Sequence, residues 1–258
     1  MEFSEAQLQQ WIAAYFWPFV RIGAMMMAAP IFSVRQVPQR LRLLLAVLTT
    51  ALVAPLLPPV PVVELFSPEG LLIMLQQLGI GVLMGFILQL AFNALIFGGQ
   101  VMAYSMGLGF ATMMDPANGV QVPVVSQYWL ILAMLAFLLS NGHLMLLAGV
   151  SQSFEVLPVA VDGLTRAGIW ALIVWSSQLF AAGLMMSLPV VISLLLVNIG
   201  LGVVSRAAPQ LNIFAVGFPI TLTIGFVMIW ITLPHVMQSF GLLVDEAMRV
   251  GLNILVTR

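Results

Sequence analysis

Charged residues are so rare in this chain that they divide it into long apolar stretches. Four stretches carry no charged side chain at all, at residues 70–114, 116–154, 167–205 and 207–244. About 20 helical residues cross a bilayer core about 30 Å thick, so each stretch is longer than one simple crossing needs. The pattern predicts an integral membrane protein whose apolar stretches contain breaks.

Apolar segments along the chain predict about six helices. They cover residues 8–29, 41–57, 71–97, 122–139, 169–201 and 213–233. The predicted fold class is therefore all-α, a polytopic membrane protein. Ser4 and Gln7 stand at capping-box spacing, which favours a first helix that starts near residue 4. The N-terminus is acidic and lacks the basic region of a cleaved signal peptide, so we expect the first segment to be retained.

Composition supports this class and excludes several chemistries. Hydrophobic residues make up 62% of the chain and charged residues 7%, whereas charged residues are about a quarter of a soluble domain. Because cysteine is absent, neither a disulfide nor a thiolate metal site can form. All 8 basic residues are arginine, which excludes a Walker A lysine and a Schiff-base lysine. The net charge of −1 argues against nucleic acid as a partner.

The sparse charges also predict a topology. The loop at residues 30–42 is bounded by prolines and carries three arginines, so the positive-inside rule places it in the cytoplasm and the acidic N-terminus outside. Residues 241–258 place Asp245, Arg249 and Asn253 four residues apart. This tail is predicted to be a partly amphipathic helix that meets a partner or the membrane surface.

The stretch 70–114 contains amide side chains among its apolar residues. An unpaired amide in hydrocarbon is costly, so these side chains must face protein or water. They are Gln76, Gln77, Gln89, Asn93 and Gln100. Gly81 and Gly85 form a small-xxx-small step, which suits a close approach between helices.

Motifs for an intramembrane enzyme are absent or weak. The sequence Gly107-Leu-Gly-Phe resembles a GxGD aspartyl site, but Phe110 stands where the aspartate is required. Gly149-Val-Ser-Gln fits a GxSx serine motif and His235 could supply a base, yet such short patterns arise often by chance and residues 152–155 look like a loop. We expect His143 and His235 to be satisfied interfacial histidines rather than ligands or proton relays.

A small-solute transporter is the main alternative from another class. It would show intramembrane carboxylates or broken helices repeated in two halves, whereas Asp115 has no counterpart. We therefore expect no catalytic residues, no cofactor, no metal and no small-molecule substrate.

Residues 107–119 are apolar yet rich in turn formers. Asp115-Pro116 and Asn118-Gly119 are turn signals, so this segment is predicted to be non-helical. Irregular backbone at membrane depth is tolerated only where protein or a water-filled cavity surrounds it, as a pore constriction would. Met113 and Met114 are flexible enough to seal such a passage and reopen it, although methionine fills gaps between helices just as often.

Residues 189–219 predict a helical hairpin with a polar tip. A proline-broken helix ends in glycines and Arg206, a polar turn follows, and a second apolar helix departs. Arg206, Gln210 and Asn212 could cap backbone carbonyls locally or contact a partner.

Three stretches of the chain resemble the FliR/SctT family of type III secretion export-gate proteins, and its flagellar branch most closely. The first runs from Arg21 through Pro30 and Pro38 to Arg40, and the second from Gly79 to Pro116. The third runs from Pro189 to Pro219 and contains Arg206-Ala-Ala-Pro-Gln-Leu-Asn-Ile-Phe214. Together they cover most of the length in the expected order, and the third is the most specific.

The resemblance implies a structural, non-enzymatic pore subunit of the flagellar export gate in the bacterial cytoplasmic (inner) membrane and flagellar basal body. It implies the partners FliP, FliQ and FlhB, and unfolded flagellar proteins that pass through the assembly. The alternative within the family is a subunit of an injectisome export gate.

The implied fold is a FliP-like part at residues 1–166 joined to a FliQ-like helical hairpin at residues 167–240, followed by the tail at 241–258. Such hairpins form a helical assembly raised largely out of the bilayer plane. The family's plug loop would match residues 107–122, with site residues Phe110, Met113, Met114, Asp115 and Pro116. The hairpin tip or partner contacts would be Arg206, Pro209, Gln210, Asn212 and Phe214. The N-terminal loop would contribute Arg21, Pro30, Pro38 and Arg40.

Overall fold

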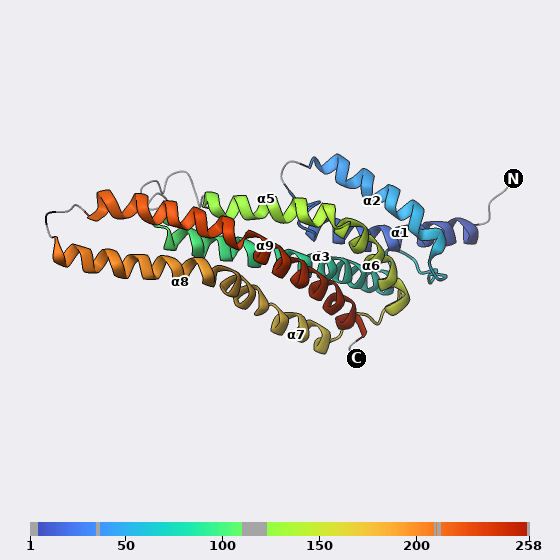
Figure 1. Ribbon diagram of the computed structural model, residues 1–258. Helices are drawn as coiled ribbons and strands as arrows, with labels where there is room; N and C mark the ends of the chain where they lie inside the picture. The colour runs from blue at the N-terminus through green and yellow to red at the C-terminus, as the bar shows by residue number, and fades with distance from the viewer. Residues whose placement is uncertain (1–4, 35–36, 110–122, 209, 211–212, 257–258) are drawn as a thin grey trace. The chain divides into compact units, whose positions relative to one another are not determined.

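The computed structural model describes residues 5–34, 37–109, 123–208, 210 and 213–256, and this part of the chain is helical without strands (Figure 1). The elements are α1 (Glu5–Ala28), α2 (Gln39–Val53), the short 3₁₀ helix η1 (Ala54–Leu56), α3 (Pro68–Ser105), α5 (Val124–Leu139), α6 (Gly142–Val156), α7 (Arg166–Trp175), α8 (Gln178–Ala207) and α9 (Ile213–Val256). The predicted all-α fold is confirmed.

The helices have the length and composition of membrane spans. Among the described residues, 5 helical segments are long and apolar enough to cross a membrane, and the bent pair α5 and α6 would make a sixth. Proline lies inside α1, α8 and α9, which membrane helices tolerate because neighbouring groups satisfy the freed carbonyls. The chain is therefore an all-α polytopic membrane protein, as predicted.

Helix starts follow signals in the sequence. α1 is helical from Glu5, the first described residue, and the cap predicted at Ser4 lies outside the described residues. α3 begins at Pro68 directly after Ser67, whose Oγ accepts a hydrogen bond from the Gly70 amide at 3.0 Å. α7 begins after Thr165, whose Oγ1 accepts from the Gly168 amide at 3.1 Å.

The helix α6 was not predicted, and the expectation that residues 152–155 form a loop is wrong. Asn141 turns the chain with a φ of 58°, and the following helix is bent by 67° from α5. The buried residues of α6 include Leu146, Val150 and Phe154, which recur every four positions. The second half of the helix carries Ser151, Gln152, Ser153 and Glu155, and these polar residues disguised its end as a loop.

Two other boundaries also differ from the predicted segments. The segment predicted at 169–201 is divided into α7 and α8, because the chain breaks after Trp175 at a pair of serines. The segment predicted at 213–233 continues without a break to Val256, so the tail is helical as predicted but belongs to α9.

The chain forms two compact units, which are described separately. Unit 1 comprises Met1–Leu90, Leu138–Ser176 and Val244–Arg258, and unit 2 comprises Ala91–Phe137 and Ser177–Leu243. Both α3 and α9 contribute to each unit.

In unit 1, α1 packs closely against the first half of α3. A Cβ atom on Gly85 would lie 2.6 Å from the Met25 carbonyl oxygen, and one on Gly81 would strike the Arg21 carbonyl. The close approach predicted from the small-xxx-small step is thereby confirmed. The last turns of α9 also pack within this unit, since Ala247 is fully buried and Gly251 faces Ile87 of α3.

In unit 2, the second half of α3 contacts α5, α8 and α9 (Figure 1). The ring of Phe92 meets the rings of Phe137 and Phe240 edge-on, with centroids 5.6 and 5.1 Å away. Gly98 faces the backbone of Gly183 in α8, where an added Cβ would lie 2.7 Å from the carbonyl oxygen. These contacts make α3 the central helix of the unit.

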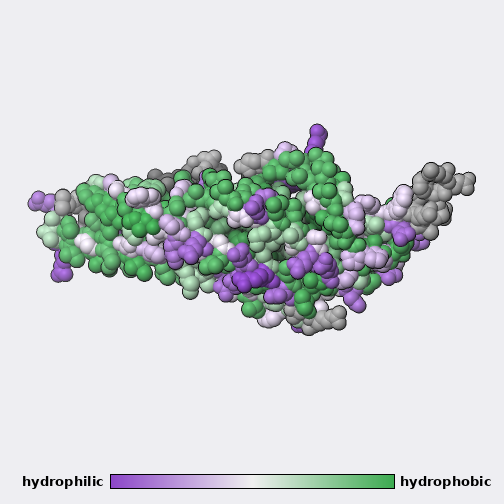
Figure 2. Space-filling view, turned by 45° about the vertical axis from the view of Figure 1, so that its right-hand side comes forward, coloured by the Kyte–Doolittle hydropathy of each residue, from purple (hydrophilic) through white to green (hydrophobic). Residues whose placement is uncertain are grey.

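Large apolar side chains nevertheless cover much of the surface, as Figure 2 shows for one face. In the 18-residue apolar stretch that makes each helix a candidate span, 67% of the residues are buried in α3. The corresponding value is 28% in the α7–α8 segment and 28% in α9. On α8, Leu196 is 66% exposed and Val203 66%, while Trp230 on α9 is 76% exposed. Such surfaces require lipid or another protein as their neighbour.

Candidate functional site

Arg21 forms a buried polar cluster in unit 1. It lies within α1, not in the N-terminal loop with which the sequence analysis grouped it, because the helix continues seven residues further to Ala28. Among the described residues it is the one charged side chain that is fully buried. Its Nε donates to Gln77 Oε1 at 2.8 Å, Nη1 donates to the carbonyl and hydroxyl oxygens of Ser153 at 2.9 and 3.0 Å, and Nη2 donates to the Leu157 carbonyl at 2.9 Å.

The cluster joins three helices without a carboxylate partner among the described residues. Its acceptors belong to α3 and to the C-terminal end of α6, and the guanidinium carbon lies 3.9 Å from the centre of the Phe154 ring. Neutral oxygens and an aromatic face together offset the cost of burying the cation. Four of the five guanidinium N–H groups have acceptors and the side chain is enclosed, so the cluster fixes the three helices against one another.

The sequence pointed to only part of this cluster. Gln77 was expected to face protein or water, and the structure confirms that it faces protein. Gln76 also has a protein partner, since its Oε1 accepts from the Leu164 amide at 3.0 Å. Ser153, Phe154 and Leu157 were missed, because the segment that holds them was interpreted as a loop.

The entrance to the predicted plug loop is a well-defined helix end in unit 2. Gly107 has a φ of 84°, which glycine adopts without strain. Its amide donates to the Tyr104 carbonyl at 3.0 Å, and the Leu108 amide donates to the Ala103 carbonyl at 3.0 Å. These two bonds are those of a Schellman motif with Gly107 at the position after the cap, so α3 stops where the sequence predicted a non-helical segment to begin.

This helix end is held by α9. The Thr221 hydroxyl shares its hydrogen between the Phe218 carbonyl at 3.0 Å and the Met106 carbonyl at 3.4 Å, and a Cβ on Gly225 would lie 2.6 Å from Met106 Cγ. A Cβ on Gly107 would lie 3.3 Å from the Phe218 ring. We call Met106, Gly107, Phe218, Thr221 and Gly225 the plug anchor.

The far end of the predicted loop is also fixed within unit 2. Pro123 is buried, and its carbonyl accepts from the Ser126 amide at 2.9 Å as α5 begins. Ser126 in turn lies against Gly99 of α3. The five predicted plug residues Phe110, Met113, Met114, Asp115 and Pro116 lie outside the described residues.

The predicted hairpin tip is described in part. Arg206 lies exposed in the last turn of α8, where a cation is favoured by the helix dipole. Neither a hydrogen bond nor an ion pair joins it to the described residues, so the structure offers no support for local capping by this side chain. Gln210 is exposed, Pro209 and Asn212 lie outside the described residues, and Phe214 occupies the first turn of α9.

The other residues of the predicted N-terminal loop lie around the start of α2. Pro30 is buried in the turn after α1, Pro38 is the residue before α2, and Arg40 lies exposed in the first turn of that helix. Arg40 is therefore helical, because α2 begins two residues earlier than the apolar pattern suggested.

The weak enzyme motif is not assembled in either unit. Ser151 lies inside the helix α6 in unit 1, and His235 lies exposed on α9 in unit 2. His143 Nδ1 is buried without a hydrogen-bond partner among the described residues, so the expectation of a satisfied histidine is wrong for that atom. Within the described ranges, a group of three or more potential metal-ligating side chains is not found.

Comparison with known proteins decides the family. Residues 12–247 match the family of bacterial export proteins, family 1. The chain belongs to the FliR family of bacterial export proteins. It is 41% identical to the flagellar biosynthetic protein FliR of Pectobacterium carotovorum over 91% of this chain and 89% of that protein. It is 41% identical to FliR of Escherichia coli over 87% and 86% of the two chains, and 31% identical to FliR of Bacillus subtilis over 84% of each.

The part of the chain that matches the family contains both features described above. The matched range includes the Arg21 cluster and the plug anchor, and it ends inside α9. The FliR/SctT resemblance drawn from the sequence is thereby confirmed.

Proposed function

We propose that this protein is a structural, pore-forming subunit of the flagellar protein export gate in the bacterial cytoplasmic membrane. The observation that carries the proposal is the near full-length similarity to flagellar biosynthetic proteins FliR, joined to an all-α membrane fold. In the assembled gate, unfolded flagellar proteins pass through the complex and this subunit performs no chemical step on them.

The plug anchor supports a gating role for residues 107–122. The segment starts at a Schellman motif whose last carbonyl is held by Thr221, and it ends at the buried Pro123. Both ends are thus attached to packed helices of unit 2, as a loop that closes a pore would require. We propose that Phe110, Met113, Met114, Asp115 and Pro116 form the plug.

Uncovered apolar helices support assembly with other membrane proteins. We propose FliP, FliQ and FlhB as those partners, with residues 1–166 as the FliP-like part and 167–240 as the FliQ-like hairpin. Exposed leucine and valine on α8 suit a neighbouring helix as well as lipid. The exposed Arg206 and Gln210 at the hairpin tip are proposed to contact a partner, since Arg206 has no acceptor among the described residues.

The plug proposal predicts a specific defect. Deletion of residues 110–116 should leave assembly intact but let small ions cross the membrane, because the apolar seal is removed while the anchor stays. Ion leakage is measured by membrane depolarisation in cells that express the complete gate, and co-purification of FliP and FliQ serves as the assembly control. A tight membrane with normal secretion and normal assembly would contradict the plug assignment.

The flagellar role is tested in a strain that lacks this gene. Restoration of swimming by the full chain is expected, whereas an injectisome subunit would instead restore effector delivery. A small-solute transporter would purify alone or as a homo-oligomer, while a gate subunit should co-purify with unlike small membrane proteins. Mass analysis of the detergent-extracted complex separates these two outcomes.

A further inference from the structure

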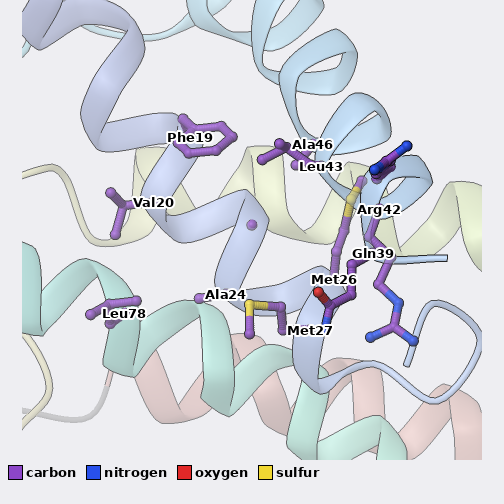
Figure 3. Close-up of a pocket in the computed structure, with 12 residues that line it drawn as sticks. Phe19, Val20, Ala24, Met26, Met27, Gln39, Arg42, Leu43, Ala46 and Leu78 are labelled. Atoms are coloured by element: carbon purple, nitrogen blue, oxygen red, sulfur yellow. The ribbon is translucent and has the colours of Figure 1, made fainter. Parts of the chain in front are cut away.

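A large apolar pocket lies within unit 1, between α1, α2 and the first half of α3 (Figure 3). Its volume is about 630 Å³, which is in the range of small-molecule and cofactor sites. Phe19 and Met26 of α1, Leu43 and Ala46 of α2, and Leu78 of α3 are among the residues that line it. Only 11% of the residues in the α2 window are buried, so α2 packs against α1 along a narrow face, which includes Ala46 and Thr50, and leaves this space beside it.

One end of the pocket is cationic. Arg40 and Arg42 line it together with Gln39, and the described lining residues include no acidic side chain. Figure 3 shows Gln39, Arg42 and Met26 on one side of the pocket and Val20 and Leu78 on the other. The space is therefore amphiphilic, with positive charge at the start of α2 and apolar walls beyond it.

The guanidinium of Arg42 is held in place, but only some of its N–H groups have hydrogen-bond acceptors among the described residues. Its Nη2 donates to the Val34 carbonyl at 2.8 Å, which holds the guanidinium beside the loop. Its Nε is enclosed and has no hydrogen-bond partner among the described residues. Its Nη1 is not enclosed and has no hydrogen-bond partner among the described residues, so a negatively charged oxygen in the pocket would accept a charge-assisted hydrogen bond from it.

We propose that this pocket binds an anionic glycerophospholipid, with its phosphate at Arg40 and Arg42 and an acyl chain along the apolar walls. The two arginines lie at the N-terminal end of a predicted membrane span, Gln39–Leu56, where lipid headgroups are found. Basic pockets between membrane helices suit anionic headgroups, and the apolar walls suit the hydrocarbon of the same molecule. The inference rests on unit 1 alone and does not depend on the proposed pore function.

Gly23 provides a means to fill the pocket. It lines the space, and a Cβ built on it would meet no atom within 4 Å. Gly23→Leu should therefore place a side chain in the pocket without disturbing α1, and leucine also favours the helix. Gly200→Leu is a matched control, because Gly200 of α8 likewise has no neighbour within 4 Å and does not line the pocket.

Charge is tested with a second pair of variants. Arg40→Gln/Arg42→Gln removes both cations from the pocket. Arg166→Gln/Arg249→Gln removes the same charge from exposed positions in unit 1 and serves as the control.

The experiment uses the full chain in mild detergent, with native mass spectrometry to measure binding of phosphatidylglycerol and phosphatidylcholine that carry the same acyl chains. Wild type should prefer phosphatidylglycerol, and the double variant should lose roughly thirtyfold in phosphatidylglycerol affinity, since each basic residue near an anionic headgroup contributes about fivefold. Gly23→Leu should lose both lipids, and both controls should bind like wild type. The thermal midpoint of each variant shows that it remains folded.

Three results would overturn the proposal. The first is equal affinity of wild type for the two lipids, because the arginines would then recognise no charge. The second is a folded Gly23→Leu variant that binds phosphatidylglycerol like wild type, because the lipid would then lie elsewhere. The third is a photo-crosslinker at residue 23 that attaches only to a protein segment in intact membranes, since the occupant would then be a polypeptide.

Discussion

At the residue scale, Arg21 shows how a membrane protein can enclose a permanent cation. Four hydrogen bonds to neutral oxygens and the face of Phe154 take the place of water, and the acceptors come from two other helices. Arginine is suited to this task because its planar fork presents donors in several directions at once, whereas lysine is a compact point charge.

This geometry predicts that Arg21→Lys destabilises the protein although the charge is kept. The single ammonium of lysine cannot reach the oxygens of Gln77, Ser153 and Leu157 together, so buried acceptors lose their partners at a cost of roughly 2 to 4 kcal/mol. Thermal unfolding of the detergent-extracted protein measures the effect. Arg249→Lys, at an exposed position, is the control and should stay close to wild type. An Arg21→Lys midpoint equal to that of the control would show that the hydrogen bonds contribute little.

The same residues show what the sequence could reveal at this scale. The rule that a buried amide needs a partner identified the Oε1 of Gln77 correctly, whereas its Nε2 is buried without a hydrogen-bond partner among the described residues. It could not identify Ser153 or Leu157, since a backbone carbonyl that serves as an acceptor leaves no trace in the amino-acid type. Likewise, the turn signal at Gly107 was visible in the sequence, but Thr221 as the residue that holds Met106 was not.

At the element scale, α3 is the helix around which each unit packs. Its apolar residues surround the helix axis, which is typical of a helix buried in protein or lipid on all sides. α3 contacts its neighbours most closely at its glycines. Gly81 and Gly85 lie against α1, and Gly98 lies against α8. The apolar stretch therefore predicted the helix, and its glycines predicted the close approach, but not which helices would fill these positions.

We predict that Gly85→Ala is destabilising. The new Cβ would lie 2.6 Å from the Met25 carbonyl and 2.7 Å from Ala28 Cβ, so α1 must move away from α3. Overpacking of this kind costs about 1 to 3 kcal/mol. Gly241→Ala is the matched control, because a Cβ there meets no atom within 4 Å and alanine should favour the helix by up to about 1 kcal/mol. Thermal midpoints that fall for Gly85→Ala and rise or stay level for Gly241→Ala would agree with the packing.

Boundaries between helices were predicted less well than the helices themselves. The break between α7 and α8 has neither glycine nor proline, and the serines at the break can continue a helix, as Ser193 does by donating to the Pro189 carbonyl at 2.7 Å. Conversely, Pro219 and Pro234 lie inside α9 without ending it. In neither case does the local residue type decide where the helix ends.

At the scale of the whole molecule, the uncharged stretches after α3 bury little of their surface within the described part of the chain. All the long helices expose large apolar residues, of which Leu75 of α3 is 62% exposed and Trp230 of α9 76%. Lipid alone could cover these residues, because hydrocarbon is as apolar as leucine. The proposed assembly differs from coverage by lipid alone, because it requires other proteins to lie against particular faces of these helices.

This difference can be measured at α8. The chain contains no cysteine, so Leu196→Cys provides a single thiol on the exposed face of the helix, where Leu196 is 66% exposed. A benzophenone attached to that thiol in intact membranes should crosslink to another small membrane protein if α8 packs in an assembly, because the photoproduct forms with whatever lies in contact. Leu194→Cys is the control, since Leu194 is fully buried and should not react with the label. Adducts with lipid alone from Leu196→Cys would mean that this face of α8 meets the bilayer, and the assembly would then have to use other surfaces.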